Sequence, residues 1–478
     1  MFPTALFTMF LTIRLAAQAV YQAALYQLES LFVRGTIGGP IPSLRQWKNF
    51  NGQVKFGLKS SDYLTPSTFE ELKQMVIDAR DNGYTIKPVG SGHSFNDITL
   101  KAARGKVVSL REKYNRLISV DKENKTVTLQ GGMVIRTLCR ELEKHGLGLH
   151  NIGNYYEQTV GGALATGTHG TTGKNHLDTF TSIIKRLELI TSNGDVVVID
   201  GKDSVTIGTL GIIHQITLSC VDMFWIEHRI IPIHNINDFT NEEDVNDLLA
   251  KNDFMFFRWI TMAGSTERAT LETFNIVHDK NRVTPLNNIL IQLSILIKYW
   301  FLLPVGNYIP VWLSKFITNH IVPLFPERRI DAYYLALAVP GLIAAHFESE
   351  WALPHSKLHS VMQHLTKDRE EFFGRSVVEI HIRFSPADSA RLSPANGKDT
   401  VWVDVNVPDL NLNVDELCRN MIKAGGRPHW SKVHHMLAPQ IALLGYDFSH
   451  LKRMRNDLDP NGVFSTSPYI ERVLGHLI

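Results

Sequence analysis

Two glycine-rich segments constrain the fold more than any other feature of this chain. The first, Gly90-Ser91-Gly92-His93-Ser94, directly follows a strand-like run at residues 85–89. Ser67, with Glu70 three residues later, predicts the start of a helix before that strand. A helix, a strand and a glycine-rich turn in this order leave backbone N–H groups free to converge on anionic oxygens. Taken alone, the segment also fits an ordinary tight turn, because Phe95 stands where a dinucleotide-binding fingerprint would have its third glycine.

The second segment spans residues 161–170 and reads Gly-Gly-Ala-Leu-Ala-Thr-Gly-Thr-His-Gly. Glycine at this density disfavours regular structure and permits close backbone approach. The threonine hydroxyls and free N–H groups could bind a diphosphate or the polar edge of a flat ring. A structural turn is the alternative.

Size and composition bound the remaining possibilities. A length of 478 residues predicts two or three domains. Hydrophobic residues make up 44% and charged residues 20%, as in an ordinary folded protein. A net charge of +2, without a basic run interleaved with aromatics, argues against a nucleic-acid partner. The 3 cysteines are widely separated and form neither a disulfide framework nor a metal-ligand pattern, so we expect no metal.

The patterning along the chain predicts an α+β fold. Two hairpins are expected, at residues 117–129 and at residues 187–199 around Asn193-Gly194. Beyond residue 225 the helical stretches lengthen, which predicts a domain boundary there. We therefore expect a first domain over residues 51–225, a second over 226–440, and a C-terminal segment, 441–478, that packs back on the first.

Two apolar stretches indicate a membrane. Residues 2–28 carry one charge, Arg14, so residues 1–50 are expected to hold a membrane anchor, with an amphipathic surface helix as the alternative. A second stretch, within residues 286–325, combines apolar and aromatic residues with Lys298 and Lys315, which suits a segment lying in the headgroup region. A buried core helix fits this stretch equally well.

Four sequence blocks, in order, resemble one family. Val-Gly-Ser-Gly-His-Ser at 89–94 and the block at 159–170 resemble the FAD domain of the vanillyl-alcohol oxidase superfamily. His429-Trp430-Ser431-Lys432 and the block at 458–464 resemble the aldonolactone oxidoreductases, the gulonolactone oxidase type, within it. The resemblance implies a two-subdomain FAD-binding domain plus an α+β substrate (cap) domain. It implies FAD tethered covalently through His93. The residues expected to hold the FAD are Val89, Gly90, Ser91, Gly92, His93, Ser94, Asp97, Thr159, Gly162, Thr166, Gly167, Thr168, His169, Gly170 and Ile213.

The resemblance also implies the catalytic residues. Lys432 would stabilise negative charge near flavin N1 and C2=O, and His429 would contact the substrate or the ring. Family members carry a Glu-x-Arg pair on a strand of the second domain. Here Arg383 matches, but His381 occupies the glutamate position. Strand periodicity puts Glu379 on the same face, about 7 Å away, as a substrate-binding candidate. Two roles are open for His381: the neutral imidazole accepts the proton of the substrate hydroxyl, or it orients a substrate different from that of the family. A third possibility is that the altered site turns over slowly.

The implied activity is oxidation of a sugar 1,4-lactone, such as L-gulono-1,4-lactone, at a ring hydroxyl. Hydride would pass to flavin N5, O2 would reoxidise the flavin to give H2O2, and the product would be of the ascorbate type. An aldonolactone dehydrogenase, or an oxidase of D-arabinono-lactone or alditols, is the alternative. A membrane-associated protein that keeps the flavin fold without catalysis is the second alternative. The endoplasmic reticulum is the expected location, with the mitochondrial membrane second.

Overall fold

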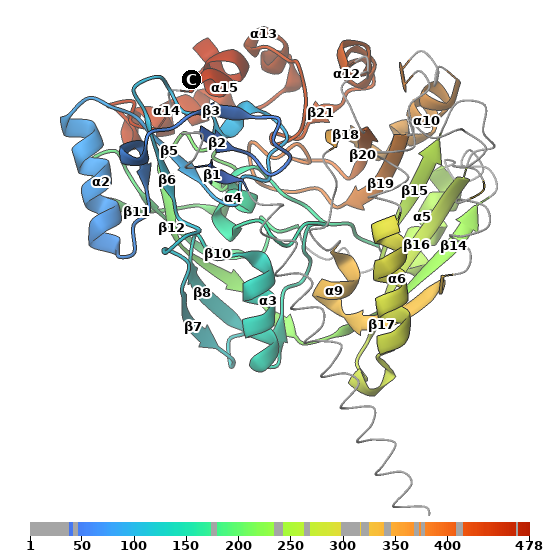
Figure 1. Cartoon of the computed structure of the whole chain (residues 1–478). Helices are drawn as coiled ribbons and strands as arrows, with labels where there is room; N and C mark the ends of the chain where they lie inside the picture. The colour runs from blue at the N-terminus through green and yellow to red at the C-terminus, as the bar shows by residue number, and fades with distance from the viewer. Residues whose placement is uncertain are drawn as a thin grey trace, which may run out of the picture.

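The computed structural model describes residues 38–41, 46–173, 179–233, 242–261, 268–297, 316, 325–338, 346–367, 372–373, 378–407, 414–464 and 467–478. All structural statements below concern these residues. Figure 1 shows mixed helix and sheet arranged in two lobes, with the earlier part of the chain on the left and the long later sheet on the right. The α+β prediction is confirmed.

The first lobe contains two three-stranded sheets. One is parallel, with the strand order β4-β6-β5, and the other is antiparallel, with the order β1-β2-β3. The strands are β1 (Gly39–Ile41), β2 (Gln46–Lys48), β3 (Lys55–Gly57), β4 (Tyr63–Leu64), β5 (Ile86–Val89) and β6 (Lys106–Ser109).

Helix α2 (Phe69–Asp81) leads into β5 and begins one residue later than the sequence predicts. Thr68, not Ser67, is its N-cap, and the Thr68 hydroxyl accepts a hydrogen bond from the Glu71 N–H at 3.1 Å. The Glu71 carboxylate in turn accepts from the Ser67 N–H at 2.7 Å. Ser67 and Thr68 are both good caps, and the register that places Leu72 and Val76 in the core selects between them.

A five-stranded antiparallel sheet, in the order β11-β10-β12-β8-β7, completes the first lobe. Both predicted hairpins are present in it, as β7–β8 and β10–β11. Its elements are β7 (Leu117–Asp121), β8 (Thr126–Gln130), β10 (Ile184–Ile190), β11 (Val196–Ile199) and β12 (Ile212–Ser219). Near it lie α3 (Ile135–Lys144), α4 (Val160–Ala165) and the two-stranded ladder of β9 (Leu147–Gly148) with β13 (Val221–Asp222).

The second lobe is built on an eight-stranded antiparallel sheet, in the order β17-β14-β16-β15-β19-β20-β18-β21. Its strands are β14 (Trp225–Ile233), β15 (Phe254–Thr261), β16 (Arg268–Val277), β17 (Arg328–Ala332), β18 (Phe347–Pro354), β19 (Val378–Ser385), β20 (Thr400–Val407) and β21 (Arg427–Pro428). The register sets His381 of β19 opposite Arg258 of β15 and Asp404 of β20. The helices of this lobe are α5 (Glu242–Lys251), α6 (Pro285–Ile297), α9 (Tyr333–Leu337), α10 (Leu358–Lys367) and α12 (Val414–Lys423).

The C-terminal helices lie over the first lobe, at the top of Figure 1. They are α13 (Ala438–Ile441), α14 (Phe448–Leu458) and α15 (Pro468–Val473). The Asp459 carboxylate accepts hydrogen bonds from the N–H groups of Val463 and Phe464, and the Val463 carbonyl accepts from Ile86 N–H of β5 at 2.8 Å. The turn at residues 459–464, between α14 and α15, therefore holds the strand that leads into the glycine-rich loop.

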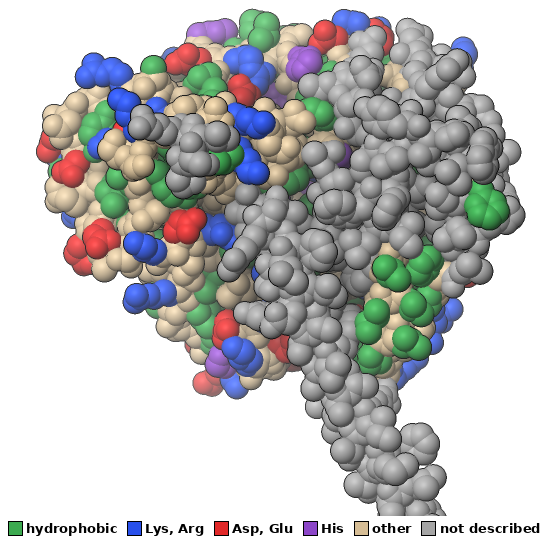
Figure 2. Space-filling model, viewed as in Figure 1, with side chains coloured by type: hydrophobic (Ala, Val, Ile, Leu, Met, Phe, Trp, Pro, Cys, Tyr) green, Lys and Arg blue, Asp and Glu red, His purple; other side chains and the backbone are tan. Residues whose placement is uncertain are grey.

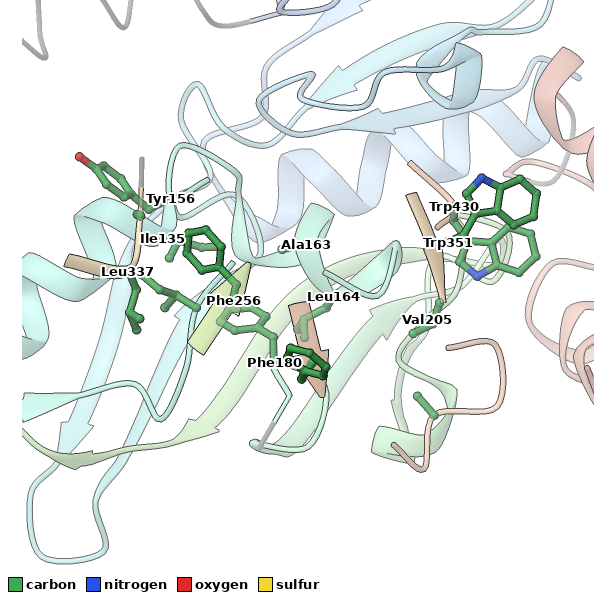
Figure 3. Close-up of a cluster of buried hydrophobic side chains, with 14 of the residues drawn as sticks. Ile135, Tyr156, Ala163, Leu164, Phe180, Val205, Phe256, Leu337, Trp351 and Trp430 are labelled. Carbon is green, nitrogen blue, oxygen red and sulfur yellow. The ribbon is translucent and has the colours of Figure 1, made fainter. Parts of the chain in front are cut away.

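One large hydrophobic core contains side chains from both lobes, including Leu164 of α4 and Phe256 of β15. Figure 3 shows part of this cluster, with Ile135 and Tyr156 near Leu337 and with Trp351 near Trp430. Shared burial of this kind connects the cofactor-side elements to the eight-stranded sheet.

Neither membrane expectation can be followed far in the structure. The N-terminal stretch at residues 2–28 lies outside the described residues, as does most of the 286–325 segment apart from α6. Within the described ranges, no helix has both the length and the apolar character needed to cross a bilayer.

Candidate active site

The first glycine-rich loop packs so tightly that side chains are excluded at two positions. A Cβ on Gly90 would lie 2.0 Å from Thr159 Oγ1. Gly92 has a φ of +65°, and a Cβ there would lie 2.8 Å from Gly38 Cα. The loop is held by the Gly38 N–H, which donates to the Ser91 carbonyl, and by the Phe50 N–H, which donates to the Gly92 carbonyl, both at 2.9 Å.

The second glycine-rich segment faces the first across one cavity. Thr159 is the N-cap of α4, and its hydroxyl accepts from the Gly162 N–H at 3.3 Å. The cavity has about 620 Å³ of empty space, part of it open to solvent. Its lining includes nine of the predicted cofactor residues: Val89, Gly90, Ser91, Gly92, His93, Ser94, Thr159, Gly162 and Thr166.

His93 presents an uncommitted nitrogen in this cavity. Its ring stacks on Phe50 with the centroids 4.9 Å apart, and Nε2 has no hydrogen-bond partner among the described residues. Burial, aided by the positive charge of Arg111, lowers the pKa of His93 to about 3, so the imidazole is neutral. The Ser91 hydroxyl is likewise buried without a partner in the described chain. His93 Nε2 and the Ser91 hydroxyl are thus two buried polar atoms without partners in a cavity lined by glycines. A bound flavin nucleotide would supply the contacts that these atoms lack.

The C-terminal motif is bound directly to the first loop. The Phe95 N–H donates to the Ser431 carbonyl at 2.7 Å, and the Asn96 amide donates to the carbonyls of Trp430 and Lys432. Ser431 and Gln158 line both the cofactor cavity and a second, polar cavity beside it. The two cavities are therefore contiguous.

The second cavity collects charged and imidazole side chains from the eight-stranded sheet. Its lining includes Gly153, Asn154, Tyr155, Gln158, Thr168, His169, Glu348, Glu350, His381, Arg383, Asp404, His429, Ser431 and Lys432. All three predicted catalytic residues belong to this set, as does His429. Thr168 and His169, predicted to bind the cofactor, also line this second cavity.

Arg383 and Glu350 form the centre of the cavity. The Arg383 guanidinium donates to Glu350 and lies 3.4 Å from Asp404 Oδ2. His169 Nε2 lies 3.2 Å from Glu350 Oε1, and its ring stacks on Trp402 with the centroids 3.6 Å apart. Burial alone would raise the pKa of Glu350, but Arg383 and His169 outweigh it and hold the pKa well below the usual value. Glu350 is therefore an ionised carboxylate.

Asp404 behaves in the opposite way. Burial and the adjacent negative charge of Glu350 raise its pKa well above the usual value. A protonated Asp404 next to an ionised Glu350 is the expected outcome for two buried carboxyl groups that share one site.

Lys432 enters from the C-terminal motif. Its ammonium group pairs with Glu348 and lies 3.8 Å from Asp404 Oδ2 and 4.7 Å from the centre of the Phe95 ring. Burial lowers the pKa of Lys432 to about 7. The ammonium lies at the end of the cavity that adjoins the cofactor loop, through Phe95.

Five predicted residues line neither cavity: Asp97, Gly167, Gly170, Ile213 and Glu379. Asp97 instead pairs with Arg472 at 2.7 Å, which ties α15 to the loop. Gly167 and Gly170 serve local geometry, since Gly167 has a φ of +72° and a Cβ on Gly170 would lie 2.2 Å from Asn151 Oδ1. The Ile213 carbonyl abuts Gly131, where a Cβ would lie 2.2 Å away. Glu379 pairs with Arg258 and lies behind His381.

Sequence reasoning missed Glu348, Glu350, Asp404 and Trp402. A signal was available: Glu348 and Glu350 alternate within β18, and Asp404 interrupts an otherwise mostly apolar run in β20. A buried carboxylate needs a partner, so this alternation indicates a site.

Comparison with known proteins agrees with this geometry. Residues 61–200 match the family described as "FAD binding domain", and residues 216–473 match "D-arabinono-1,4-lactone oxidase". The chain belongs to this aldonolactone oxidoreductase family. It is 26% identical to the L-gulonolactone oxidase of Bos taurus, over 87% of this chain and 96% of that protein. It is 27% identical to the L-gulono-1,4-lactone dehydrogenase of Mycobacterium tuberculosis, over 90% and 99% of the two chains.

The fold of this family member is also seen in solved structures. Cholesterol oxidase from B. sterolicum superposes with a TM-score of 0.71 at 14% identity, covering 90% of this chain and 96% of that one. At this identity the likeness concerns the fold alone. The vanillyl-alcohol oxidase type fold and the FAD cofactor expected from the sequence are thus confirmed for the aldonolactone oxidoreductase described here.

Proposed function

We propose that this protein oxidises a ring hydroxyl of a sugar 1,4-lactone, with FAD as the immediate electron acceptor. The observation that carries the proposal is the contiguity of the two cavities, which share Gln158 and Ser431. The glycine-rich loop at residues 90–94, which would bind the phosphates, lies on one side of this junction. His381, Arg383 and Lys432 lie on the other side. A lactone in the second cavity would therefore lie next to a ring that extends from the first.

Each side chain has a chemical task in this scheme. FAD, when bound, accepts the hydride at N5. The Arg383 guanidinium, fixed by Glu350, binds and orients the lactone oxygens. Neutral His381 accepts the proton of the reacting hydroxyl, because burial and the nearby guanidinium groups lower its pKa despite the opposing effect of Glu379. The Lys432 ammonium stabilises negative charge on the cofactor side, in a site shielded from water.

The remaining polar groups complete the cavity. His429, whose Nδ1 lies 3.0 Å from the Ser431 hydroxyl, is neutral because burial lowers its pKa to about 4. It would contact the lactone or the ring edge from the cavity wall, since it also hydrogen-bonds the Gly167 backbone. His169 would hold Glu350 in place from the second glycine-rich segment, because its Nδ1 lies 2.9 Å from the Gly170 carbonyl and its Nε2 lies 3.2 Å from Glu350.

The covalent tether is part of the proposal. The unpartnered Nε2 of His93 and the neutrality of its ring support bonding to the flavin C8-methyl group, since only a neutral imidazole is nucleophilic. The new bond would replace a methyl C–H bond, and the two electrons released would reduce the flavin, which O2 would then reoxidise. The test is a denaturing gel viewed under ultraviolet light after acid treatment. Flavin fluorescence that migrates with the polypeptide supports the tether, and fluorescence only at the dye front refutes it.

The lactone oxidation is tested by anaerobic mixing of the purified protein with L-gulono-1,4-lactone. Loss of the oxidised flavin band near ~450 nm is expected. Retention of that band with L-gulono-, L-galactono- and D-arabinono-1,4-lactone would refute the activity and leave the alternative of a flavin-fold protein without catalysis. Arg383 and Lys432, which match the family, line one cavity and favour catalysis, whereas His381 at the glutamate position is what supports the alternative.

We propose O2 as the final acceptor, with H2O2 and an ascorbate-type enediol as products. The curated relatives include both oxidases and a dehydrogenase, so a dehydrogenase is the second candidate. One H2O2 formed per lactone consumed supports the oxidase, whereas turnover that requires an artificial acceptor such as a quinone or cytochrome c identifies a dehydrogenase.

We also propose membrane association, in part through α6. Leu286, Ile289 and Leu293 of this helix are 45–68% exposed. Figure 2 shows hydrophobic surface in the region where Figure 1 places α6. Apolar sequence continues directly after α6. Such a face suits the headgroup region of the endoplasmic reticulum membrane, or secondly a mitochondrial membrane. Co-flotation with phosphatidylcholine vesicles that weakens in a Leu286→Asp/Leu293→Asp variant would support this role for α6, and unchanged flotation would exclude it.

We also propose the division into a cofactor domain, a substrate domain and a C-terminal segment that the sequence predicts. A substrate domain over residues 226–440 would carry the lactone-binding side chains of β18, β19 and β20. The segment at 441–478 would belong with the cofactor domain, to which Val463 and Arg472 connect it.

A further inference from the structure

His381 lies at one end of a row of buried charged side chains that crosses the eight-stranded sheet. Each member comes from the strand beside the previous one, except that Glu379 and His381 share β19. From the edge strand inward the row consists of Arg329 on β17, His228 on β14, Glu272 on β16, Arg258 on β15, Glu379 and His381 on β19. Every one of these residues is 6% exposed or less.

The links are direct. Arg329 Nε donates to His228 Nδ1 at 3.3 Å, and His228 Nε2 lies 2.9 Å from Glu272 Oε2. Arg258 Nε donates to Glu272 Oε1 at 2.6 Å, and Arg258 Nη1 donates to Glu379 Oε1.

The last link reaches the imidazole. His381 Nε2 lies 3.1 Å from Glu379 Oε1, an ion-pair distance without the alignment of a hydrogen bond, whereas Nδ1 lies 4.0 Å from Asp404 Oδ2. Asp404 lines the lactone cavity, while Glu379 does not. One imidazole nitrogen therefore faces the charged row, and the other faces the substrate side.

This row does not conduct protons. A guanidinium group carries no acceptor and does not lose a proton in proteins, so Arg258 interrupts any relay between Glu272 and Glu379. What the row supplies is fixed geometry and fixed charge. Glu379 is held in place by Arg258, and Arg258 is held in turn by Glu272.

We propose that Glu379 and Arg258 are positioning residues: they hold His381 with Nε2–H toward Glu379, so that Nδ1 stays free to accept the substrate proton. Glu379 would thus act behind the imidazole and not on the lactone. The arrangement follows the logic by which a carboxylate orients a catalytic histidine and stabilises its protonated form. This inference rests on the proposed lactone oxidation.

The charges around His381 determine how the variants should behave. Glu379 raises the pKa of His381, and Arg258 and Arg383 lower it, against the background of burial. Asp404 on β20 faces Nδ1, and the ring of Phe256 on β15 lies 5.9 Å away. Removing Glu379 should therefore lower the pKa of His381, and removing Arg258 should raise it.

The experiment measures flavin reduction by L-gulono-1,4-lactone against pH, under anaerobic conditions, in Glu379→Gln, Arg258→Met and the double variant. We expect the acid limb of kcat/KM to move to lower pH in Glu379→Gln and to higher pH in Arg258→Met. The maximal rate should fall about 10²-fold or more in Glu379→Gln, the range seen when a general base is disabled. The double variant removes both members of the Arg258–Glu379 pair, and Glu272 keeps its contact with His228, so it should fold at least as well as Arg258→Met. Its maximal rate should be at least about tenfold below that of the wild type.

Glu227→Gln is the matched control. It makes the same chemical change on the same sheet, but Glu227 pairs with Arg328 and Arg229, away from His381. It should keep the wild-type rate and pH profile. The inference would be overturned if the single variants had reduced rates but the acid limb of their kcat/KM profiles did not move. A wild-type rate in the double variant would also overturn it.

NMR titration of labelled histidine gives a readout that does not need turnover. Opposite shifts of the His381 pKa in the two single variants are expected, and unchanged titration would overturn the inference. A wild-type protein that no lactone reduces, but whose His381 shows these opposite shifts, would refute the proposed function and leave the charge coupling standing.

Discussion

The tight contact between the two glycine-rich segments makes Gly90→Ala a quantitative test of the cofactor cavity. The backbone of Gly90 is not in the left-handed region, so alanine meets no conformational strain there. Its Cβ would, however, lie 2.0 Å from Thr159 Oγ1, 3.1 Å from Cβ and 3.2 Å from Cγ2 of the same residue. Thr159 cannot rotate freely, because its hydroxyl caps α4 through the Gly162 N–H.

The expected cost has two parts. Inserting a methyl group into a packed site costs about 1–3 kcal/mol, and displacing the N-cap adds about 1 kcal/mol. Gly90→Ala should therefore lower the free energy of unfolding by about 2–4 kcal/mol. Thr159→Ala removes the clashing atoms and loses only the cap, about 1 kcal/mol. The double variant should cost about the same as Thr159→Ala alone, which is a coupling of about 2–4 kcal/mol.

The assay is urea unfolding of the four proteins prepared without flavin, with flavin content measured separately. Gly57→Ala is the control, because a Cβ on Gly57 would meet nothing within 4 Å. It should remain within about 0.5 kcal/mol of the wild type. Additive costs in the double variant would refute the claim that the two segments touch through this pair.

Three further predictions concern the histidines and Arg383. His381→Ala should lower turnover by about 10²–10⁴-fold, and a wild-type rate in steady-state kinetics would remove His381 from the mechanism. Arg383→Met should raise KM for the lactone, and it leaves the buried Glu350 without its guanidinium partner. The unfolding midpoint should therefore fall together with the affinity for the lactone. Arg391→Met is the control: Arg391 pairs with Asp203 away from both cavities, so KM should be preserved. Burial lowers the pKa of His434 to about 3, below its unfolded value of 6.5. The contribution of neutral His434 to the free energy of unfolding is therefore complete above about pH 6.5 and is lost as the pH falls from there toward 3. Between pH 7.5 and 5.5 the wild type should lose about 1 kcal/mol more unfolding free energy than His434→Asn does, and equal losses would contradict the burial argument.

The local sequence was sufficient for the features that depend on neighbouring residues. Hairpins at Asn193-Gly194 and at residues 117–129, the helix before β5, and the two glycine-rich turns are all specified within short segments, by turn chemistry and apolar spacing. The placement of the N-cap failed by one residue, since both Ser67 and Thr68 can cap and the difference comes from the packing of Leu72 and Val76.

The charged half of the site depends instead on which strands are neighbours. Glu350 and Arg383 are 33 residues apart, and Arg258 and Glu379 are 121 apart, yet each pair shares a buried contact. Strand periodicity correctly placed Glu379 and His381 on one face, but it carries no information about the strands on either side. The antiparallel register put Arg258 on one flank of β19 and Asp404 on the other. Arg258 and His381 lower the pKa of Glu379 against burial, whereas burial and the Glu350 carboxylate raise the pKa of Asp404. A carboxylate's charge state depends on what surrounds it in space, so folding had to bring these groups together before their chemistry could be assigned.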